Sequence, residues 1–264
     1  MIKQLMQSRA VMLRLSKYGA GVHRPSISLR GTAVLLLAMA IFSSCNKTEE
    51  FIIDYKYDYY PLETGHYVVY DVDSIVIDDF TQTTDTFRYQ KKYVIDSTFT
   101  DNIGRAAYKL IRYQRGDPTQ GWTLTDVWYV VRTETTLEVN EENQRFVKLL
   151  FPPDEGQTWN GNQYIDSVDA NWYLWHPSAW EYTISEVDKP AIINGFQFDS
   201  TLTVTQQSDS TLIEKVISVE KYAKHVGMIY KYFSALEKNG DITRPWSNPE
   251  SGFILVFSIS EYGN

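Results

Sequence analysis

From residue 51 onward, apolar and polar positions alternate along the chain with a period of two. Phe87, Tyr89, Tyr93 and Ile95 share one parity, while charged and amide side chains occupy the other. The same alternation gives Val127, Tyr129, Val131, Leu137 and Val139 a common parity, and likewise Phe253, Leu255, Phe257 and Ile259. In segments rich in Tyr, Val, Ile and Thr, this period predicts β-strands with one buried face.

Turn sequences separate these segments, at residues 102–104, 116–118, 160–162, 194–195 and 239–240. Asn-Gly, Gly-Asp-Pro and similar combinations favour tight connections between strands. No segment shows the spacing of a long amphipathic helix. The predicted fold class is therefore all-β, an antiparallel sandwich or an incomplete barrel that occupies residues 59–264.

Two segments of this region resemble each other. Residues 60–68 and 151–159 carry an aromatic residue, proline, an acidic residue and glycine in register, 91 residues apart. Gly104 and Gly195 have the same separation. Since proline fixes φ and glycine accepts positive φ, both segments predict a turn that leads into a strand. One interpretation is two similar halves, 60–150 and 151–264; the other is convergent turn chemistry.

The first 44 residues differ from the rest of the chain. They hold six of the 25 Lys and Arg residues and none of the 33 Asp and Glu residues. The apolar run 31–42 is shorter than the ~20 residues that span a membrane, and with basic residues before it, it is typical of a secretory signal peptide. We predict a signal peptide over 1–44, with a long basic leader or a true start at Met12.

The segment that follows this run resembles a bacterial lipobox. Ser43 and Ser44 precede Cys45, the only cysteine of the chain, and in a lipobox this cysteine is lipidated and becomes the new N-terminus. We therefore predict lipid attachment at Cys45 and a linker over 45–58. The alternative is a buried cysteine near an ordinary N-terminal helix. A single cysteine also excludes an intramolecular disulfide framework.

Residues 46–50 and the charge of the body indicate the compartment. The Lys-x-Glu-Glu order after Asn46 resembles the export signal of Bacteroidota surface lipoproteins, although Thr48 interrupts that pattern. We predict a lipid-anchored protein of the bacterial outer membrane that faces the periplasm or the cell surface. From Cys45 onward, 19 basic and 33 acidic residues give a net charge of −14, which excludes nucleic acid binding through a general basic field.

Three segments of the body resemble uncharacterised lipoproteins of Bacteroidota. They are residues 60–70, residues 146–162 with the pattern aromatic-Pro…Gly…Trp-x-Gly-Asn, and residues 221–231 with the pattern Tyr-Ala-Lys-x-Val-Gly-x-Ile-Tyr-Lys. The resemblance covers most of the mature chain. It implies an envelope lipoprotein and no particular activity.

Motifs of catalysis and metal binding are absent from the sequence. It has no Gly-x-Ser-x-Gly elbow, His-Glu-x-x-His helix or glycine-rich phosphate loop. His66, His176 and His225 are far apart, and we interpret each as a surface or turn residue. The carboxylates at 71, 73, 78 and 79 lack the glycine of a calcium loop, so we interpret them as a solvated strand edge. We predict no catalytic residue, metal or cofactor.

The segment 172–182 is the most unusual stretch of the chain, because Trp172, Trp175 and Trp180 fall within nine residues beside a proline. Exposed tryptophan rings stack on sugars or seat residues of a partner. We therefore consider a binding platform for a glycan or an envelope protein. The alternative is a small core beneath a long loop.

Three functions agree with these observations. The first is a non-enzymatic binding or structural module of the envelope, in line with the predicted anchor and the absence of catalytic motifs. The second is an extracytoplasmic hydrolase that acts on glycans through acids that the sequence does not single out. The third is a carrier of hydrophobic ligands, which would require an apolar cavity inside a half-barrel.

Overall fold

The computed structural model describes residues 53–165 and 180–264. Predictions for Cys45, Trp172, Trp175 and His176 lie outside the described residues. The regular elements are the 3-10 helix η1 (Tyr57–Tyr59) and the strands β1 (Tyr67–Asp78), β2 (Thr83–Thr100), β3 (Ala106–Arg115), β4 (Thr123–Arg132), β5 (Thr136–Glu141), β6 (Gln144–Leu150), β7 (Thr158–Asn160), β8 (Glu181–Ile193), β9 (Phe196–Ser210), β10 (Glu214–Ala223), β11 (Gly227–Glu237) and β12 (Ser251–Gly263).

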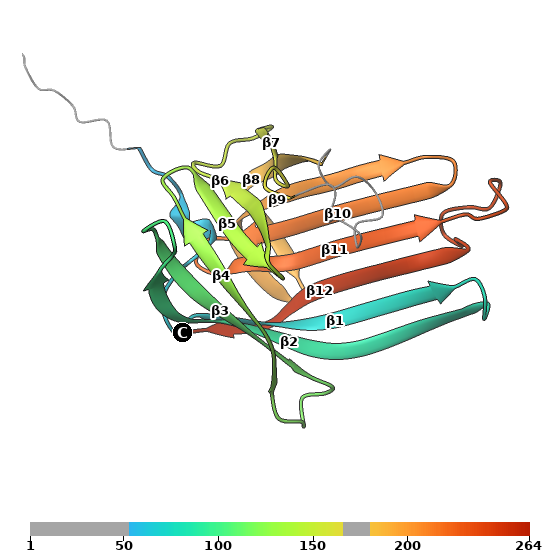
Figure 1. The fold of residues 1–264 in the computed structure, drawn as a ribbon, viewed down its shortest axis with the longest axis horizontal. Helices are drawn as coiled ribbons and strands as arrows, with labels where there is room; N and C mark the ends of the chain where they lie inside the picture. Colours follow the sequence, from blue (N-terminus) through green and yellow to red (C-terminus); the bar gives the residue numbers. More distant parts are fainter. Residues whose placement is uncertain (1–52, 166–179) are drawn as a thin grey trace, which may run out of the picture. The chain divides into compact units, whose positions relative to one another are not determined.

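All twelve strands belong to one antiparallel sheet with the order β6-β5-β4-β3-β2-β1-β12-β11-β10-β9-β8-β7. Two six-stranded meanders are joined where β1 pairs with β12. The sheet curls, so that β4, β5 and β6 cross in front of the later strands (Figure 1). Its two ends meet where the Val147 N–H donates to the Gly161 carbonyl at 2.8 Å. The all-β prediction is confirmed, and of its two forms the structure adopts the incomplete barrel.

The inward face of β4 differs from the predicted one. We expected Val127, Tyr129 and Val131 to form its buried face, but Val127 is 55% exposed. Trp128 lies opposite Leu110 of β3 and packs with Val130 against the core of the curled sheet. The indole ring buries more apolar surface than a valine side chain does, which favours this face.

The acidic residues of β1 are solvated as predicted, but the predicted position at the edge of a sheet is wrong. β1 pairs with β2 on one side and with β12 on the other. Asp71 and Asp73 are solvated on the outer face, where they accept hydrogen bonds from Gln90 and Arg88. Their period-two spacing places them opposite the buried Val72, so they mark the wet face of a central strand.

The two similar turns occupy equivalent places, each before the first strand of a meander. Gly65 and Gly156 both have positive φ, at 100° and 79°. Each turn exchanges two main-chain hydrogen bonds with an isoleucine of the second strand: Gly65 N–H to Ile95 O and Ile95 N–H to His66 O, and Gly156 N–H to Ile184 O and Ile184 N–H to Gln157 O. The proposed boundary of the halves lies between β6 and β7; duplication itself stays a prediction.

The last residues of the predicted linker contact the β body. Tyr57 packs edge-on against Phe151, with ring centroids 5.0 Å apart, and stacks on Tyr55. The Tyr55 hydroxyl donates to Glu134 at 2.7 Å. These contacts fix the point at which the chain enters the sheet.

Gly252 provides a test of the sheet geometry. Its φ is +131°, and a Cβ atom there would collide with the Ala235 carbonyl and lie 2.8 Å from Leu236 Cα on β11. We expect Gly252→Ala to lower the free energy of unfolding by at least about 2 kcal/mol, because backbone strain at this positive φ and steric overlap of the new Cβ with β11 both destabilise the folded state. Gly121→Ala, where a Cβ meets open space, should change it by less than about 0.5 kcal/mol. Urea denaturation of both variants measures this; equal effects would contradict the register of β11 and β12.

Candidate functional site

The inside of the curled sheet holds two adjoining cavities. The smaller has a volume of about 70 Å³ and extends from the turn before β1 to the middle of the sheet. The larger has a volume of about 320 Å³ and lies beside β11 and β12. Five side chains line both: Tyr93, Trp128, Glu141, Lys148 and Lys231. The two cavities therefore share a charged and aromatic wall and form one candidate site.

Strand alternation places these side chains inside. On β10, Ser218, Glu220 and Tyr222 follow one another at every second position and are all buried. Glu220 lies directly opposite Lys231 of β11. Because alternate side chains of a strand point to the same face, the pattern that buries the tyrosine also places the carboxylate in the interior.

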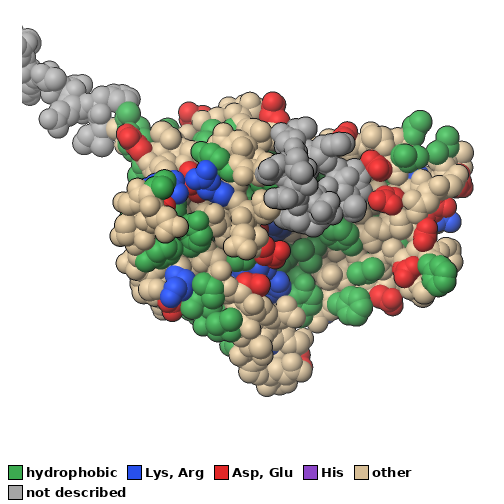
Figure 2. Space-filling view, in the orientation of Figure 1, with side chains coloured by type: hydrophobic (Ala, Val, Ile, Leu, Met, Phe, Trp, Pro, Cys, Tyr) green, Lys and Arg blue, Asp and Glu red, His purple; other side chains and the backbone are tan. Residues whose placement is uncertain are grey.

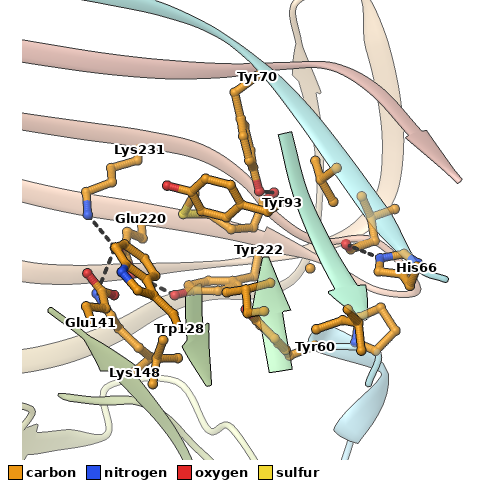
Figure 3. A pocket seen from close by; sticks show the side chains of 18 residues that line it. Tyr60, His66, Tyr70, Tyr93, Trp128, Glu141, Lys148, Glu220, Tyr222 and Lys231 are labelled. Atoms are coloured by element: carbon orange, nitrogen blue, oxygen red, sulfur yellow. Dashed lines mark hydrogen bonds and ion pairs between the residues drawn. The ribbon is translucent and has the colours of Figure 1, made fainter. Parts of the chain in front are cut away.

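A buried ion network occupies one end of the smaller cavity. Lys148 Nζ lies 2.9 Å from Glu141 and 3.2 Å from Glu220, while Lys231 Nζ lies 3.1 Å from Glu220. The Tyr222 hydroxyl donates to the other oxygen of Glu220 at 2.6 Å. Figure 3 shows these groups together, with His66 at the opposite end. Glu220 is 2% exposed, and this pairing offsets the cost of burying its charge.

The network holds its members in their charged forms. Burial by itself would raise the pKa of Glu220, but Lys148 and Lys231 outweigh it and lower that pKa to about 2. Burial likewise opposes the charge of Lys148, yet Glu141 and Glu220 raise its pKa above the usual range. Burial and the adjacent Glu220 raise the pKa of Tyr222, which stays a neutral donor. At neutral pH the site therefore contains an ionised carboxylate and an ionised lysine.

Three buried N–H donors in the larger cavity have no hydrogen-bond partner among the described residues: Arg112 Nε, Trp128 Nε1 and Gln206 Nε2. Other contacts hold their side chains in place. The Arg112 guanidinium lies 3.6 Å from the centre of the Trp128 ring and 3.2 Å from Asp126. Ser218 donates to the Gln206 carbonyl oxygen at 2.7 Å, which leaves the amide nitrogen unpaired. Unpaired buried donors are costly, so this wall is suited to a molecule that supplies acceptors.

The amine of Lys91 also lines this cavity and forms no ion pair within the described part of the chain. Burial, together with the nearby Arg112, lowers the pKa of Lys91 to about 8, and burial is the larger cause. The amine is thus a partly desolvated cation beside a second cation.

The side of the larger cavity formed by β11 and β12 is aromatic and aliphatic. Phe233 and Phe253 lie with ring centroids 5.3 Å apart, and Leu255 and Phe257 continue the wall along β12. Figure 2 shows charged side chains near the middle of the viewed face, with hydrophobic side chains beside them toward the β1–β2 turn. The cavity is therefore amphipathic, because it combines unpaired donors with a row of rings on β11 and β12.

Of the three tryptophans of the proposed platform, Trp180 lies within the described residues. It is 5% exposed, lines the larger cavity, and stacks on Phe233 at 6.4 Å between ring centroids. Trp172 and Trp175 lie outside the described residues, so the platform stays a prediction. The structure assigns Trp180 to the wall of an internal cavity.

The histidines lie apart from one another, as the sequence indicates. His225 is exposed in the β10–β11 turn, with a φ of 64°. His66 follows the turn before β1 but is buried, so the predicted surface position is wrong. Its ring lies between Asn264 Oδ1 at 2.7 Å and the Val226 carbonyl oxygen at 2.9 Å. His66 thus closes one end of the smaller cavity.

Catalysis by a carboxylic acid would need a carboxyl group that keeps its proton near neutral pH. The most buried carboxylate of the site, Glu220, has the opposite property, since its pKa is lowered to about 2. Two lysines and a tyrosine hydroxyl contact it. In this arrangement Glu220 anchors the charged wall rather than donating a proton.

Residues 53–165 and 180–264 contain neither a group of metal ligands nor a membrane-spanning helix. No group of three or more His, Cys, Asp and Glu side chains there could hold a metal ion. In the same ranges, no helix has the length and apolar character needed to cross a membrane.

No family model matches the sequence, and no curated protein matches it. Among solved structures, the chain is similar to a protein from Bacteroides fragilis described as exported and as having a YmcC-like fold, with 9% identity, a TM-score of 0.36, and 76% of this chain and 98% of that chain covered. It is also similar to a protein from Parabacteroides distasonis described as a lipoprotein, with 11% identity, a TM-score of 0.33 and the same coverage. Such low TM-scores assign neither a family nor an activity to this chain.

Proposed function

We propose that this chain is a lipid-anchored protein of the bacterial outer membrane and that its β body binds a small ligand without catalysing a reaction. The lipobox-like segment at Cys45 and the acidic body support the location. The observation that carries the binding function is the larger cavity, in which Arg112, Trp128 and Gln206 each present an unpaired buried donor. Such groups are normally satisfied, so a ligand with acceptor atoms would stabilise this wall.

The aromatic wall also favours the carrier hypothesis over the hydrolase hypothesis. Phe233, Phe253 and Leu255 give the cavity an apolar side, which is the feature that a carrier requires. The pKa of Glu220 argues against its use as a general acid. Binding and carriage are therefore the functions that the geometry supports best.

Binding of a neutral aromatic dye to the purified protein tests this proposal. N-phenyl-1-naphthylamine, whose fluorescence rises in apolar surroundings, should bind saturably with one molecule per chain. Ser218→Met, which places a larger side chain in the cavity, should weaken binding at least about tenfold. Ser234→Met is the matched control, because Ser234 is equally buried but lines a separate depression beside Trp246.

Circular dichroism and thermal melts establish that both variants fold. The proposal is overturned if the dye does not bind saturably, or if Ser218→Met and Ser234→Met bind it as the unchanged protein does.

A further inference from the structure

We propose that the ligand of the larger cavity is an amphipathic acid, with an anionic group at Arg112 and Lys91 and an apolar, preferably aromatic, body along Phe233 and Phe253. This inference rests on the proposed binding function and names the chemical class of the ligand.

The polar wall defines the head group. Arg112, Trp128 and Gln206 each present an N–H without a partner in the described ranges. Every buried polar atom that is unpaired in the described lining of this cavity is therefore a donor, and the lining carboxylate that forms no ion pair there, Glu142, is exposed. A sugar hydroxyl needs both donors and acceptors, whereas a carboxylate, sulfonate or phosphate oxygen only accepts. The set of free groups thus matches an anion better than a glycan.

The charge of the wall supports the same conclusion. Lys148 and Lys231 are neutralised by Glu141 and Glu220, so they belong to the ion network. Lys91 has no carboxylate at ion-pair distance among the described residues, and it lies on the same face of β2 as Tyr93. An anion bound between Lys91 and the Arg112 Nε group would be held by charge-assisted hydrogen bonds.

The aromatic side of the cavity defines the body of the ligand. Trp180, Phe233 and Phe253 form a continuous series of ring contacts. Phe253 is 37% exposed, so the apolar wall continues from the cavity to the surface of the sheet. A flat or extended apolar group on this wall would bury apolar area there, while its head group reached the donors of the same cavity.

Two dyes that share one aromatic body separate the head group from the body. 1-Anilinonaphthalene-8-sulfonate carries an acid, and N-phenyl-1-naphthylamine has the same rings without it. We expect the unchanged protein to bind the sulfonate at least about tenfold more tightly, the size of a charge-assisted hydrogen bond. Arg112→Gln and Lys91→Met should each remove most of this preference, measured as the ratio of the affinities for the two dyes.

Lys92→Met is the matched control. Lys92 is the next residue of β2, on the opposite face, where its amine lies 3.9 Å from the centre of the Tyr67 ring. This variant should keep the full preference for the sulfonate. Lys91 is only partly buried, so Lys91→Met tests the inference even if Arg112→Gln does not fold.

The pH dependence gives a second readout. Arg112, Asp126, Glu142 and Lys231 are the charged groups whose fields act on Lys91. Because Lys91 loses its proton as the pH rises through about 8, affinity for the sulfonate should fall between about pH 8 and 10, while affinity for the neutral dye stays constant. Lys91→Met should abolish this fall.

The outcomes distinguish the two proposals. Equal affinity for both dyes, unchanged in Arg112→Gln and Lys91→Met, overturns the amphipathic acid and leaves the binding function intact. Failure of both dyes to bind overturns the binding function as well. A preference for the sulfonate that is lost equally in Lys92→Met also overturns the assignment, because it would reflect surface charge rather than this cavity.

Discussion

Replacing Glu220 by Gln should lower the free energy of unfolding by about 3–5 kcal/mol, the usual cost of removing one partner from a buried charge cluster. Lys231 would lose its only ion-pair partner in the described part of the chain, and Lys148 would keep Glu141 alone. The Tyr222 hydroxyl would lose a charged acceptor. Urea denaturation at pH 7 measures the change.

Asp73→Asn is the control for this substitution. Asp73 forms an ion pair with Arg88 in which both side chains are at least half exposed, and such pairs contribute about 0–1 kcal/mol. We expect a change below about 1 kcal/mol. If Glu220→Gln and Asp73→Asn have equally small effects, the charge cluster does not have the buried position that the structure gives it.

The pH dependence of stability isolates the same carboxylate. The pKa of Glu220 is about 2 in the folded protein against an ordinary value of 4.5, so the unfolded chain takes up the proton first as the pH falls. The contribution of Glu220 is therefore complete above about pH 4.5 and is lost as the pH falls toward 2, by about 3 kcal/mol. Other carboxylates also titrate there, so the measurement is the difference between the unchanged protein and Glu220→Gln.

The fold class was predictable because strand alternation and turn chemistry are local properties. Phe257 and Ile259 fall on the predicted parity and are buried, and Gly195 has the positive φ of a tight turn. The choice between sandwich and barrel was not predictable, since it depends on the pairing of β1 with β12 at opposite ends of the sequence. The inward face of β4 was not predictable from parity, because Trp128 and Val130 alternate with other apolar residues and make both faces of the strand apolar.

The candidate site was hidden from the sequence for a related reason. Lys148 and Glu220 are 72 positions apart, and nothing local indicates that β6 and β10 bring them together. A usable signal did exist in each strand, however. Glu220 occupies the parity of Val216 and Tyr222, where a charge requires a partner, and Lys148 interrupts the apolar run 146–151. Charged residues at inward positions were thus the local pointers to the ion network.

Loss of the predicted lipid anchor at Cys45 should have a large effect on the membrane attachment of the protein. We expect Cys45→Ser to move the protein from the membrane fraction to the soluble fraction and to abolish incorporation of labelled palmitate, in a bacterial host that lipidates exported proteins. A lipobox cysteine receives more than one acyl chain, and each buried CH₂ contributes ~0.8 kcal/mol, so an intact anchor holds the protein stably whereas loss of the thiol removes every chain at once.

Ser44→Ala is the matched control for this experiment, because it keeps a small residue before the cysteine and preserves the thiol that is acylated. It should stay in the membrane fraction and incorporate palmitate like the unchanged protein. Since the cavity lies in the β body, soluble Cys45→Ser protein should bind the sulfonate dye with unchanged affinity, which separates the role of the anchor from that of the site. Persistent palmitate labelling of Cys45→Ser would contradict lipidation at this cysteine, and loss of dye binding would show that the site depends on the anchor.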